Sequence, residues 1–148
     1  MNRTWYEVKV KYTKQLENGT IKRVTEPYLV DAVSFTESEA RIYKEVCETC
    51  QGECSVEAIK KDNIVDIFLY EDSDVWYRCT INRIDYDDES GKERKVKEAM
   101  MVTASSVQEA AQRIQECLAD VTFDFDIHTI KETPTQGVFA YTQASELV

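Results

Sequence analysis

The sequence predicts an α+β protein made of two similar halves, residues 1–72 and 73–148, each built in the order strand, strand, helix, strand. Three observations predict it. The chain matches itself at an offset of about 71 residues, alternating apolar positions flank a glycine turn in each half, and a capped amphipathic segment follows. We expect a mostly antiparallel sheet packed by two helices, with the halves related by a pseudo-twofold axis within one compact domain.

The internal match keeps its order along the chain and includes both tryptophans. Trp5 and Tyr6 correspond to Trp76 and Tyr77. Further matched pairs are Gly19 with Gly91, Val24 with Val96, Glu26 with Glu98, Val30 with Val102, Ala32 with Ala104, Ser34 with Ser106, Glu37 with Glu109, Arg41 with Arg113, Lys60 with Lys131, Phe68 with Phe139, and Tyr70 with Tyr141. Such a series indicates a duplicated structural unit. The competing interpretation is two unrelated halves with similar patterning.

The first part of each half has the pattern of a two-stranded hairpin. Residues 6–12 alternate apolar or aromatic side chains with charged ones, as in a strand with one buried face. Asn18 and Gly19 follow, and this pair favours a tight turn. We expect the returning strand over residues 21–33, interrupted at Pro27. Because proline donates no hydrogen bond to a sheet, Pro27 implies an edge position, a bulge or a break. In the second half, residues 76–86 should pair with 92–103.

A helix is predicted after each hairpin. Ser34 with Glu37, and Ser106 with Glu109, fit the capping box, in which the serine oxygen accepts from a helix N–H and the glutamate reaches back to the cap. Strands over residues 55–60 and 123–130 should follow the helices. Short apolar segments at 64–70 and 138–141 should end the halves, and residues 142–148 should form a frayed tail.

Composition and charge exclude several classes of protein. The chain has 148 residues and a net charge of −10, which argues against broad attraction to nucleic acid or anionic lipid. It contains no apolar run of the length that spans a membrane, and its first residues lack the features of a signal peptide. We therefore expect a cytoplasmic protein with no membrane association. In that compartment the five cysteines are expected to be free thiols.

Several segments point to a known family. Residues 5–12 read Trp-Tyr-Glu-Val-Lys-Val-Lys-Tyr, and residues 24–32 read Val-Thr-Glu-Pro-Tyr-Leu-Val-Asp-Ala. With further positions at 17–19, 34–37, 39–42, 76–77 and 132–134, these segments resemble the family called domain of unknown function 4494 over most of the chain. The resemblance implies a cytosolic setting, often a phage or mobile element of Bacteroides-type bacteria, and carries no established activity. The cysteines at 47–54 are not part of the resemblance.

The cysteine cluster is the first candidate for chemistry. Cys47, Cys50 and Cys54 have the spacing C-x2-C-x3-C, which supplies three thiolates where structural zinc needs four ligands. Incidental thiols, a metal site and a redox site are the three interpretations, and the first is favoured because no second cysteine pair follows. We expect no bound metal and no cofactor.

Other catalytic patterns are absent from the sequence. It contains no nucleophile elbow, phosphate-binding loop, dinucleotide fingerprint or zinc-protease motif. His128 shares one face of its predicted strand with Asp124 and Asp126, and these side chains suit either a divalent cation or a solvated sheet face. The solvated face is the simpler explanation. We therefore expect no enzyme and no catalytic residue.

The basic residues carry the functional hypothesis. Most of the 18 Lys and Arg residues lie in the two hairpins, beside the matched tryptophans. Aromatic rings that stack bases and cations that follow phosphates are typical of single-strand binding proteins. We therefore expect single-stranded DNA or RNA as the ligand. The candidate binding residues are Trp5, Lys9, Lys11, Lys22, Trp76, Arg78, Arg94 and Lys95.

Two alternatives remain open. Trp5 and Trp76 could be core residues, with the lysines forming an ordinary solvated surface. The chain could also be an adaptor or counter-defence factor whose acidic surface binds a basic groove on a host or phage protein. Exposure of the two tryptophans is the observation that would discriminate best between a binding face and a core.

Overall fold

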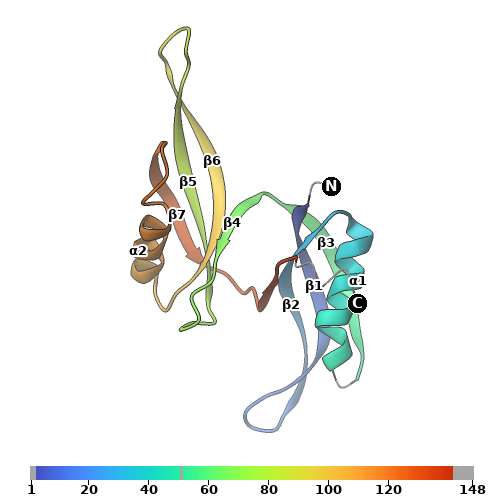
Figure 1. The fold of residues 1–148 in the computed structure, drawn as a ribbon. Helices are drawn as coiled ribbons and strands as arrows, with labels where there is room; N and C mark the ends of the chain where they lie inside the picture. Colours follow the sequence, from blue (N-terminus) through green and yellow to red (C-terminus); the bar gives the residue numbers. More distant parts are fainter. Residues whose placement is uncertain (1–2, 51, 142–148) are drawn as a thin grey trace. The chain divides into compact units, whose positions relative to one another are not determined.

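The computed structural model describes residues 3–50 and 52–141 and has an α+β fold. Its elements in chain order are β1 (Thr4–Gln15), β2 (Ile21–Ala32), α1 (Phe35–Glu45), the 3-10 turn η1 (Cys47–Thr49), β3 (Cys54–Asp62), β4 (Ile64–Phe68), β5 (Trp76–Tyr86), β6 (Glu93–Thr103), α2 (Val107–Cys117), β7 (Asp124–Glu132) and β8 (Gly137–Phe139) (Figure 1). The expected frayed tail, 142–148, lies outside the described residues.

The chain divides into two compact units. Unit 1 comprises Met1–Asp62 and Thr135–Val148, and unit 2 comprises Asn63–Pro134. The unit boundaries differ from those of the sequence halves, because residues 63–72 belong to unit 2 although they lie in the first half of the repeat.

Unit 1 contains a four-stranded sheet in the order β3-β1-β2-β8. β1 and β2 form an antiparallel hairpin, β3 pairs antiparallel with β1, and β8 pairs parallel with β2. Because β3 reaches only Tyr12 of β1, and β8 reaches only Tyr28 of β2, the outer part of the hairpin is a ribbon of two strands (Figure 1). Gly19 turns this ribbon with a φ of 84°, a conformation that costs glycine little.

Unit 2 contains a second four-stranded sheet, in the order β4-β6-β5-β7. β5 pairs antiparallel with both β6 and β7, and β4 pairs parallel with β6. The middle strands of each sheet are therefore a long hairpin, and one edge strand in each runs parallel to its neighbour. The strands thus form two mostly antiparallel sheets, each with one helix, and the α+β class predicted from the sequence is confirmed.

Each unit has its own hydrophobic core between the helix and one face of the sheet. In unit 1, Tyr6, Val8 and Val10 of β1 pack with Ile42 and Val46 at the α1 side. In unit 2 the corresponding positions are Tyr77, Cys79 and Ile81, which pack with Ala110, Ile114 and Leu118. The period-two pattern of the sequence therefore identified the buried face of both hairpins correctly.

The helix starts follow half of the predicted capping box. Ser34 Oγ accepts from Glu37 N, and Ser106 Oγ accepts from Glu109 N, each at 3.1 Å. The glutamates do not return to the cap residue. Glu37 binds Arg3 at 2.5 Å, and Glu109 accepts from the N–H of Ser105 at 2.9 Å. Each helix is thus capped by serine, while its first-turn glutamate binds a residue before the cap, Arg3 in unit 1 and Ser105 in unit 2.

Two details correct the sequence analysis. β2 continues through Pro27 without a break, and the edge position is the expected alternative that fits. β8 begins to pair only at Tyr28, so no strand lies opposite Pro27 on that side. Cys47 and Cys54 form a disulfide, whereas we expected five free thiols. Cys50, Cys79 and Cys117 are free, and Cys79 is buried.

Among the described residues, neither helix has the length and apolar character needed to cross a bilayer.

Candidate nucleic-acid interface

The sheet of each unit has one face that carries no helix of that unit, and we call it the helix-free face. In β1, the buried side chains of Tyr6, Val8 and Val10 point to the helix side. Strand alternation therefore directs Trp5, Lys9 and Lys11 to the helix-free face. The row that the sequence analysis predicted beside Trp5 is thus present on one surface of unit 1.

The register of the neighbouring strands adds two cations to this face. Arg23 lies opposite Thr13 on β2, and Lys60 lies opposite Glu7 on β3. Both have acidic partners: Lys60 Nζ is 3.6 Å from Glu7 Oε1, and Arg23 Nη2 is 3.5 Å from Glu53 Oε2. These separations place weak ion pairs at an exposed surface, where such pairs contribute little to stability.

Lys9 and Lys11 differ from those two cations. Lys9 is exposed and Lys11 is half-buried, and neither forms an ion pair with any residue in the described part of the chain. Trp5, also half-buried, is the second residue of the same strand and lies opposite Asp31 and Asp62. The residues opposite Lys9 and Lys11 are Pro27 and Ala58, and Thr25 and Ser55, none of them charged. The residues directly opposite the two lysines are therefore uncharged, and the nearby carboxylate of Glu57 on β3 accepts from the Ser55 hydroxyl at 3.1 Å.

Lys22 does not belong to this row. It pairs with Lys14 on the opposite side of the hairpin ribbon, where Lys14 Nζ lies 3.3 Å from Glu26 Oε1. Lys22 is exposed near the turn, so it extends the positive charge of the hairpin without joining the helix-free face.

Unit 2 presents a different surface. Trp76, the match of Trp5, is only 6% exposed, so a base cannot stack on its ring in this structure. Its carbonyl oxygen accepts from the backbone N–H of Thr133 at 2.9 Å and from the Thr133 hydroxyl at 2.8 Å. Trp76 thus has the surroundings of a core residue, which is the alternative that the sequence analysis left open for both tryptophans.

The predicted cations of unit 2 lie on both faces of its sheet. Arg78 donates to Asn63 Oδ1 at 2.9 Å, and Lys95 Nζ lies 3.8 Å from Asp126 Oδ2; both lie on the helix-free face by strand alternation. Arg94 pairs with Asp85 on the other face, with 3.9 Å between Nη2 and Oδ2. The structure therefore brings together Trp5, Lys9 and Lys11 more closely than it does the unit 2 residues.

The sequence matches a protein-family model over both units. The model described as Domain of unknown function (DUF4494) matches residues 4–141. The chain belongs to this family. The DUF4494 match spans every strand and helix of both units, so the two units together form the family's domain. No curated protein and no solved structure matches the chain significantly.

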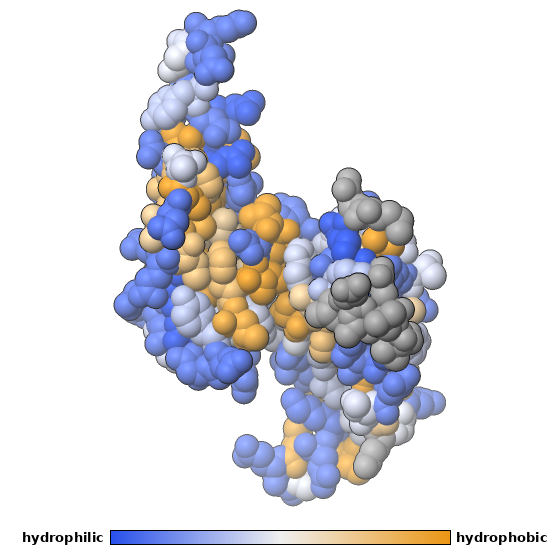
Figure 2. Space-filling model, viewed as in Figure 1, coloured by the Kyte–Doolittle hydropathy of each residue, from blue (hydrophilic) through white to orange (hydrophobic). Residues whose placement is uncertain are grey.

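In this DUF4494 member the hairpin end of unit 2 is acidic. Asp87 accepts hydrogen bonds from the N–H of Glu89 and the hydroxyl of Ser90, which hold its pKa below the ordinary value. Asp85, Asp88 and Glu89 add carboxylates nearby. Figure 2 shows mostly hydrophilic side chains over the outer part of the β5–β6 hairpin. This end would repel phosphates, so the two hairpins are electrostatically unequal.

Strand register reveals cations that the sequence analysis did not select. Arg23 and Lys60 in unit 1, and Lys97 and Lys131 in unit 2, share the helix-free faces. Counting outward from each turn would have assigned Arg23 and Lys97 to these faces. Lys60 and Lys131 required knowledge that β3 and β7 pair with β1 and β5. They are also the only two of these cations at matched repeat positions.

The possible cation site on β7 has other partners. Asp126 Oδ1 accepts from the side-chain amide of Asn82 at 3.0 Å, and its second oxygen faces Lys95. Across residues 3–50 and 52–141, no group of three or more His, Cys, Asp and Glu side chains is arranged to hold a metal ion.

Proposed function

We propose that this protein is a small non-enzymatic binding protein that holds single-stranded nucleic acid on the helix-free face of unit 1. The observation that carries the proposal is the row of Trp5, Glu7, Lys9 and Lys11 on β1, in which Glu7 pairs with Lys60 and neither Lys9 nor Lys11 has an ion pair within the described chain. Two unpaired lysines and an aromatic ring on the same strand face suit a ligand that carries both phosphates and bases. Lys22 and Arg23 extend the positive charge along the same hairpin.

Electrostatic attraction to phosphates and stacking of bases would both contribute to binding. Lysines that approach phosphates release condensed counterions, and this release makes binding depend on salt. A base stacked on an aromatic side chain adds about 1–3 kcal/mol. Stacking and phosphate contacts are tolerant of sequence, so we expect little sequence preference.

We further propose that the two units are copies of one ancestral unit. The parallel supporting this is local: β1, β2, α1 and β3 recur as β5, β6, α2 and β7, with the same strand order and the same serine caps. The pseudo-twofold relation between them remains a prediction, and so does a second nucleic-acid platform in unit 2. Burial of Trp76 makes that second platform weaker than the first.

The proposed setting is the cytoplasm of a bacterial cell that carries a phage or mobile element, as the family resemblance implies. In that setting single-stranded DNA or RNA is an available ligand, and the proposed role requires no cofactor.

Fluorescence titration with short oligonucleotides at low and moderate salt tests the proposal. Quenching of Trp5 emission is expected, with an affinity that falls as salt rises. The variant Lys9→Ala/Lys11→Ala should bind more weakly and should reduce the salt slope by about 0.7 for each lost phosphate contact. A variant lacking Trp76 isolates the Trp5 signal.

The matched control is Lys61→Ala. Lys61 lies on β3 beside Lys60 but opposite Tyr6, so it belongs to the helix side. This variant should bind like the unmodified chain. Absence of any fluorescence change at either salt concentration, or equal weakening by Lys61→Ala, would sink the proposal.

A second candidate function is a protein-interaction adaptor or counter-defence factor that binds a basic partner surface. The observation that favours it is Tyr86, which is 60% exposed at the acidic hairpin end of unit 2. Exposed tyrosines are common anchors of protein interfaces, and the surrounding carboxylates would steer a basic partner. Recovery of one nuclease-resistant protein from host lysate, lost with Tyr86→Ser and kept with Lys9→Ala/Lys11→Ala, would favour this function.

A further inference from the structure

The fourth strand of each sheet comes from an unexpected part of the chain. β4 completes the sheet of unit 2 and β8 completes the sheet of unit 1. In the sequence repeat, Phe68 and Tyr70 match Phe139 and Tyr141, so β4 and β8 belong to matched trailing segments of the two halves. Each trailing segment therefore completes the sheet of the other half. The edge of β2 is thus a docking site for an extended strand that arrives from a distant part of the sequence.

Backbone and aromatic contacts define this docking site in unit 1. β8 pairs with β2 through Leu29 with Val138 and Val30 with Phe139, and the N–H of Gln136 donates to the Pro27 carbonyl at 2.9 Å. The ring of Phe139 stacks on Tyr28 with 6.0 Å between centroids. Phe139 also packs against the core below α1.

Two arginines hold the residues that follow β8. Arg41 of α1 donates to the Ala140 carbonyl at 3.2 Å, and its other terminal nitrogen donates to the Asp31 carbonyl. Arg3 lies over the Tyr141 ring at 3.8 Å from its centroid and binds Asp31 Oδ1 at 3.1 Å. The docked segment is therefore held by the Ala140 carbonyl and the Tyr141 ring. The same segment of another copy of the chain would present the same two groups.

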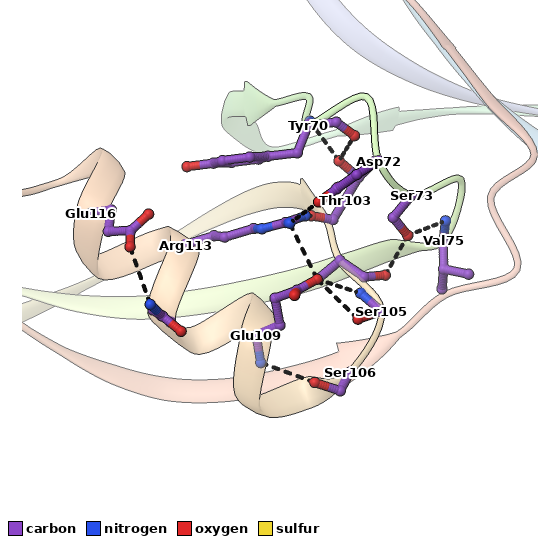
Figure 3. Close-up of polar contacts among 12 residues, drawn as sticks. Tyr70, Asp72, Ser73, Val75, Thr103, Ser105, Ser106, Glu109, Arg113 and Glu116 are labelled. Atoms are coloured by element: carbon purple, nitrogen blue, oxygen red, sulfur yellow. Dashed lines mark hydrogen bonds and ion pairs between the residues drawn. The ribbon is translucent and has the colours of Figure 1, made fainter.

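Unit 2 repeats this arrangement around Arg113, the match of Arg41 (Figure 3). Arg113 donates to the Thr103 carbonyl at 2.8 Å and to Asp72 Oδ2 at 2.5 Å, and it lies 4.2 Å from the centre of the Tyr70 ring. The Thr103 hydroxyl accepts from Tyr70 N at 2.6 Å and donates to its carbonyl at 2.9 Å. In unit 2 the helix arginine contacts the tyrosine ring itself, whereas in unit 1 Arg41 of the helix holds the Ala140 carbonyl and Arg3 holds the Tyr141 ring.

Side-chain size distinguishes the two docking sites. A Cβ atom at Gly137 would lie 3.2 Å from Tyr28 Cδ1 and 3.3 Å from Phe139 Cζ, which is tighter than ordinary contact. The matching position in β4 is Asp66, which lies opposite Met100 instead of a tyrosine. β8 therefore fits the edge of β2, and β4 in its place would meet the ring of Tyr28.

We propose that the edge of β2, with Arg3 and Arg41, is an interaction surface for residues 137–141 of a second copy of this chain. Two copies would exchange β8 reciprocally and form a strand-exchanged dimer. The exchanged strand makes the same contacts as in the monomer, so exchange sacrifices no interaction and depends mainly on chain concentration. β8 pairs through only three residues, Gly137–Phe139, and its release exposes an edge that another strand can join. This inference goes beyond nucleic-acid binding and does not require it.

Disulfide trapping between full-length chains tests the exchange. Leu29 and Val138 are register partners across β2 and β8. One chain carries Leu29→Cys and a second carries Val138→Cys; they are mixed at high concentration, refolded together and oxidised. A covalent dimer is expected, with residues 29 and 138 joined in its peptide map. Absence of this inter-chain peptide at every concentration would overturn the proposal.

Two controls keep the test sharp. A single chain with Leu29→Cys and Val138→Cys should form the bond internally at low concentration, and its failure to do so would remove the docking site itself. The matched negative control pairs Leu29→Cys with Ile67→Cys, which stands at the position of Val138 in β4. We expect this mixture to give little 29–67 product, because Asp66 does not fit beside Tyr28. Equal yield in the two mixtures would show that the edge has no selectivity and would overturn the assignment.

Discussion

The matched glutamates Glu26 and Glu98 show, at the scale of single residues, how differently the two units use a shared position. Glu26 Oε2 accepts from the hydroxyl of Tyr12 at 2.6 Å, whereas Glu98 Oε1 pairs with Arg83 Nη1 at the same separation. Burial, with a further contribution from Glu26, raises the pKa of Tyr12, so its hydroxyl stays a donor. The carboxylates at this matched position thus bind different partners: Glu26 binds the Tyr12 hydroxyl in unit 1, and Glu98 binds the Arg83 guanidinium in unit 2.

Cys79 should make the stability of unit 2 depend on pH in the alkaline range. Burial raises the pKa of its thiol from the ordinary value of 9.0 to about 11. Between these values the unfolded chain loses a proton that the folded chain keeps, so the free energy of unfolding should fall as pH rises. The loss should be roughly 2–3 kcal/mol between pH 9 and pH 11.

Urea unfolding of reduced protein from pH 8 to pH 11 measures this effect. Cys79→Ala should be less stable at pH 8, because it leaves a small cavity, but its stability should decline less steeply above pH 9. Identical pH profiles for the two proteins would show that the thiol does not contribute.

The disulfide between Cys47 and Cys54 should stabilise unit 1. It closes a short loop, with a sequence separation of 7 residues. Chain entropy predicts a contribution of about 2.5 kcal/mol for a loop of this length. Cys47→Ser/Cys54→Ser should lower the midpoint of urea unfolding relative to the oxidised chain. Adding a thiol reductant should lower the unfolding midpoint of the unmodified protein. The same reductant should leave the midpoint of the variant unchanged, and this comparison is the control.

At the scale of elements, the two hairpins and two helices could be predicted because their signals are local. Alternation in residues 6–12, a turn glycine such as Gly19, and a cap serine such as Ser34 each act within a few residues. The partners of β4 and β8 could not be predicted, since any apolar segment of that length can pair with several edges. The burial of Trp76 could not be predicted either, because strand alternation assigns a side chain to one face of the sheet but does not show whether other residues cover that face. The Cys47–Cys54 bond likewise depends on how β3 lies beside β1.

Gly137 should be the most sensitive position of β8. A Cβ atom there would press on Tyr28 and Phe139, both part of the core of unit 1. Gly137→Ala should therefore destabilise unit 1 by about 1–3 kcal/mol. Hydrogen exchange should become faster in residues 28–30 of β2, whereas β5 and β6 should keep their protection. The control is Val138→Ala, which shortens the neighbouring side chain without crowding Tyr28.

At the scale of the whole molecule, the two separate cores predict two regions of separable stability. Ile42 and Ile114 are fully buried residues at comparable places in α1 and α2. Ile42→Ala and Ile114→Ala should each destabilise their own unit by about 2–5 kcal/mol. Amide exchange resolved by peptide should show lost protection in the unit that carries the substitution and near-normal protection in the other. Equal loss in both units, from either variant, would mean that the chain unfolds as one cooperative body.

The placement of β8 has a consequence for the order in which the chain matures on the ribosome. Unit 2 occupies one continuous stretch, Asn63–Pro134, so every strand of its sheet has been made once β7 has emerged. Unit 1 begins earlier but waits for Gly137–Phe139 before its sheet is complete. Until then the edge of β2 stays open on the nascent chain, next to other nascent chains on the same message. The half that is translated second is therefore the one whose sheet can be completed first.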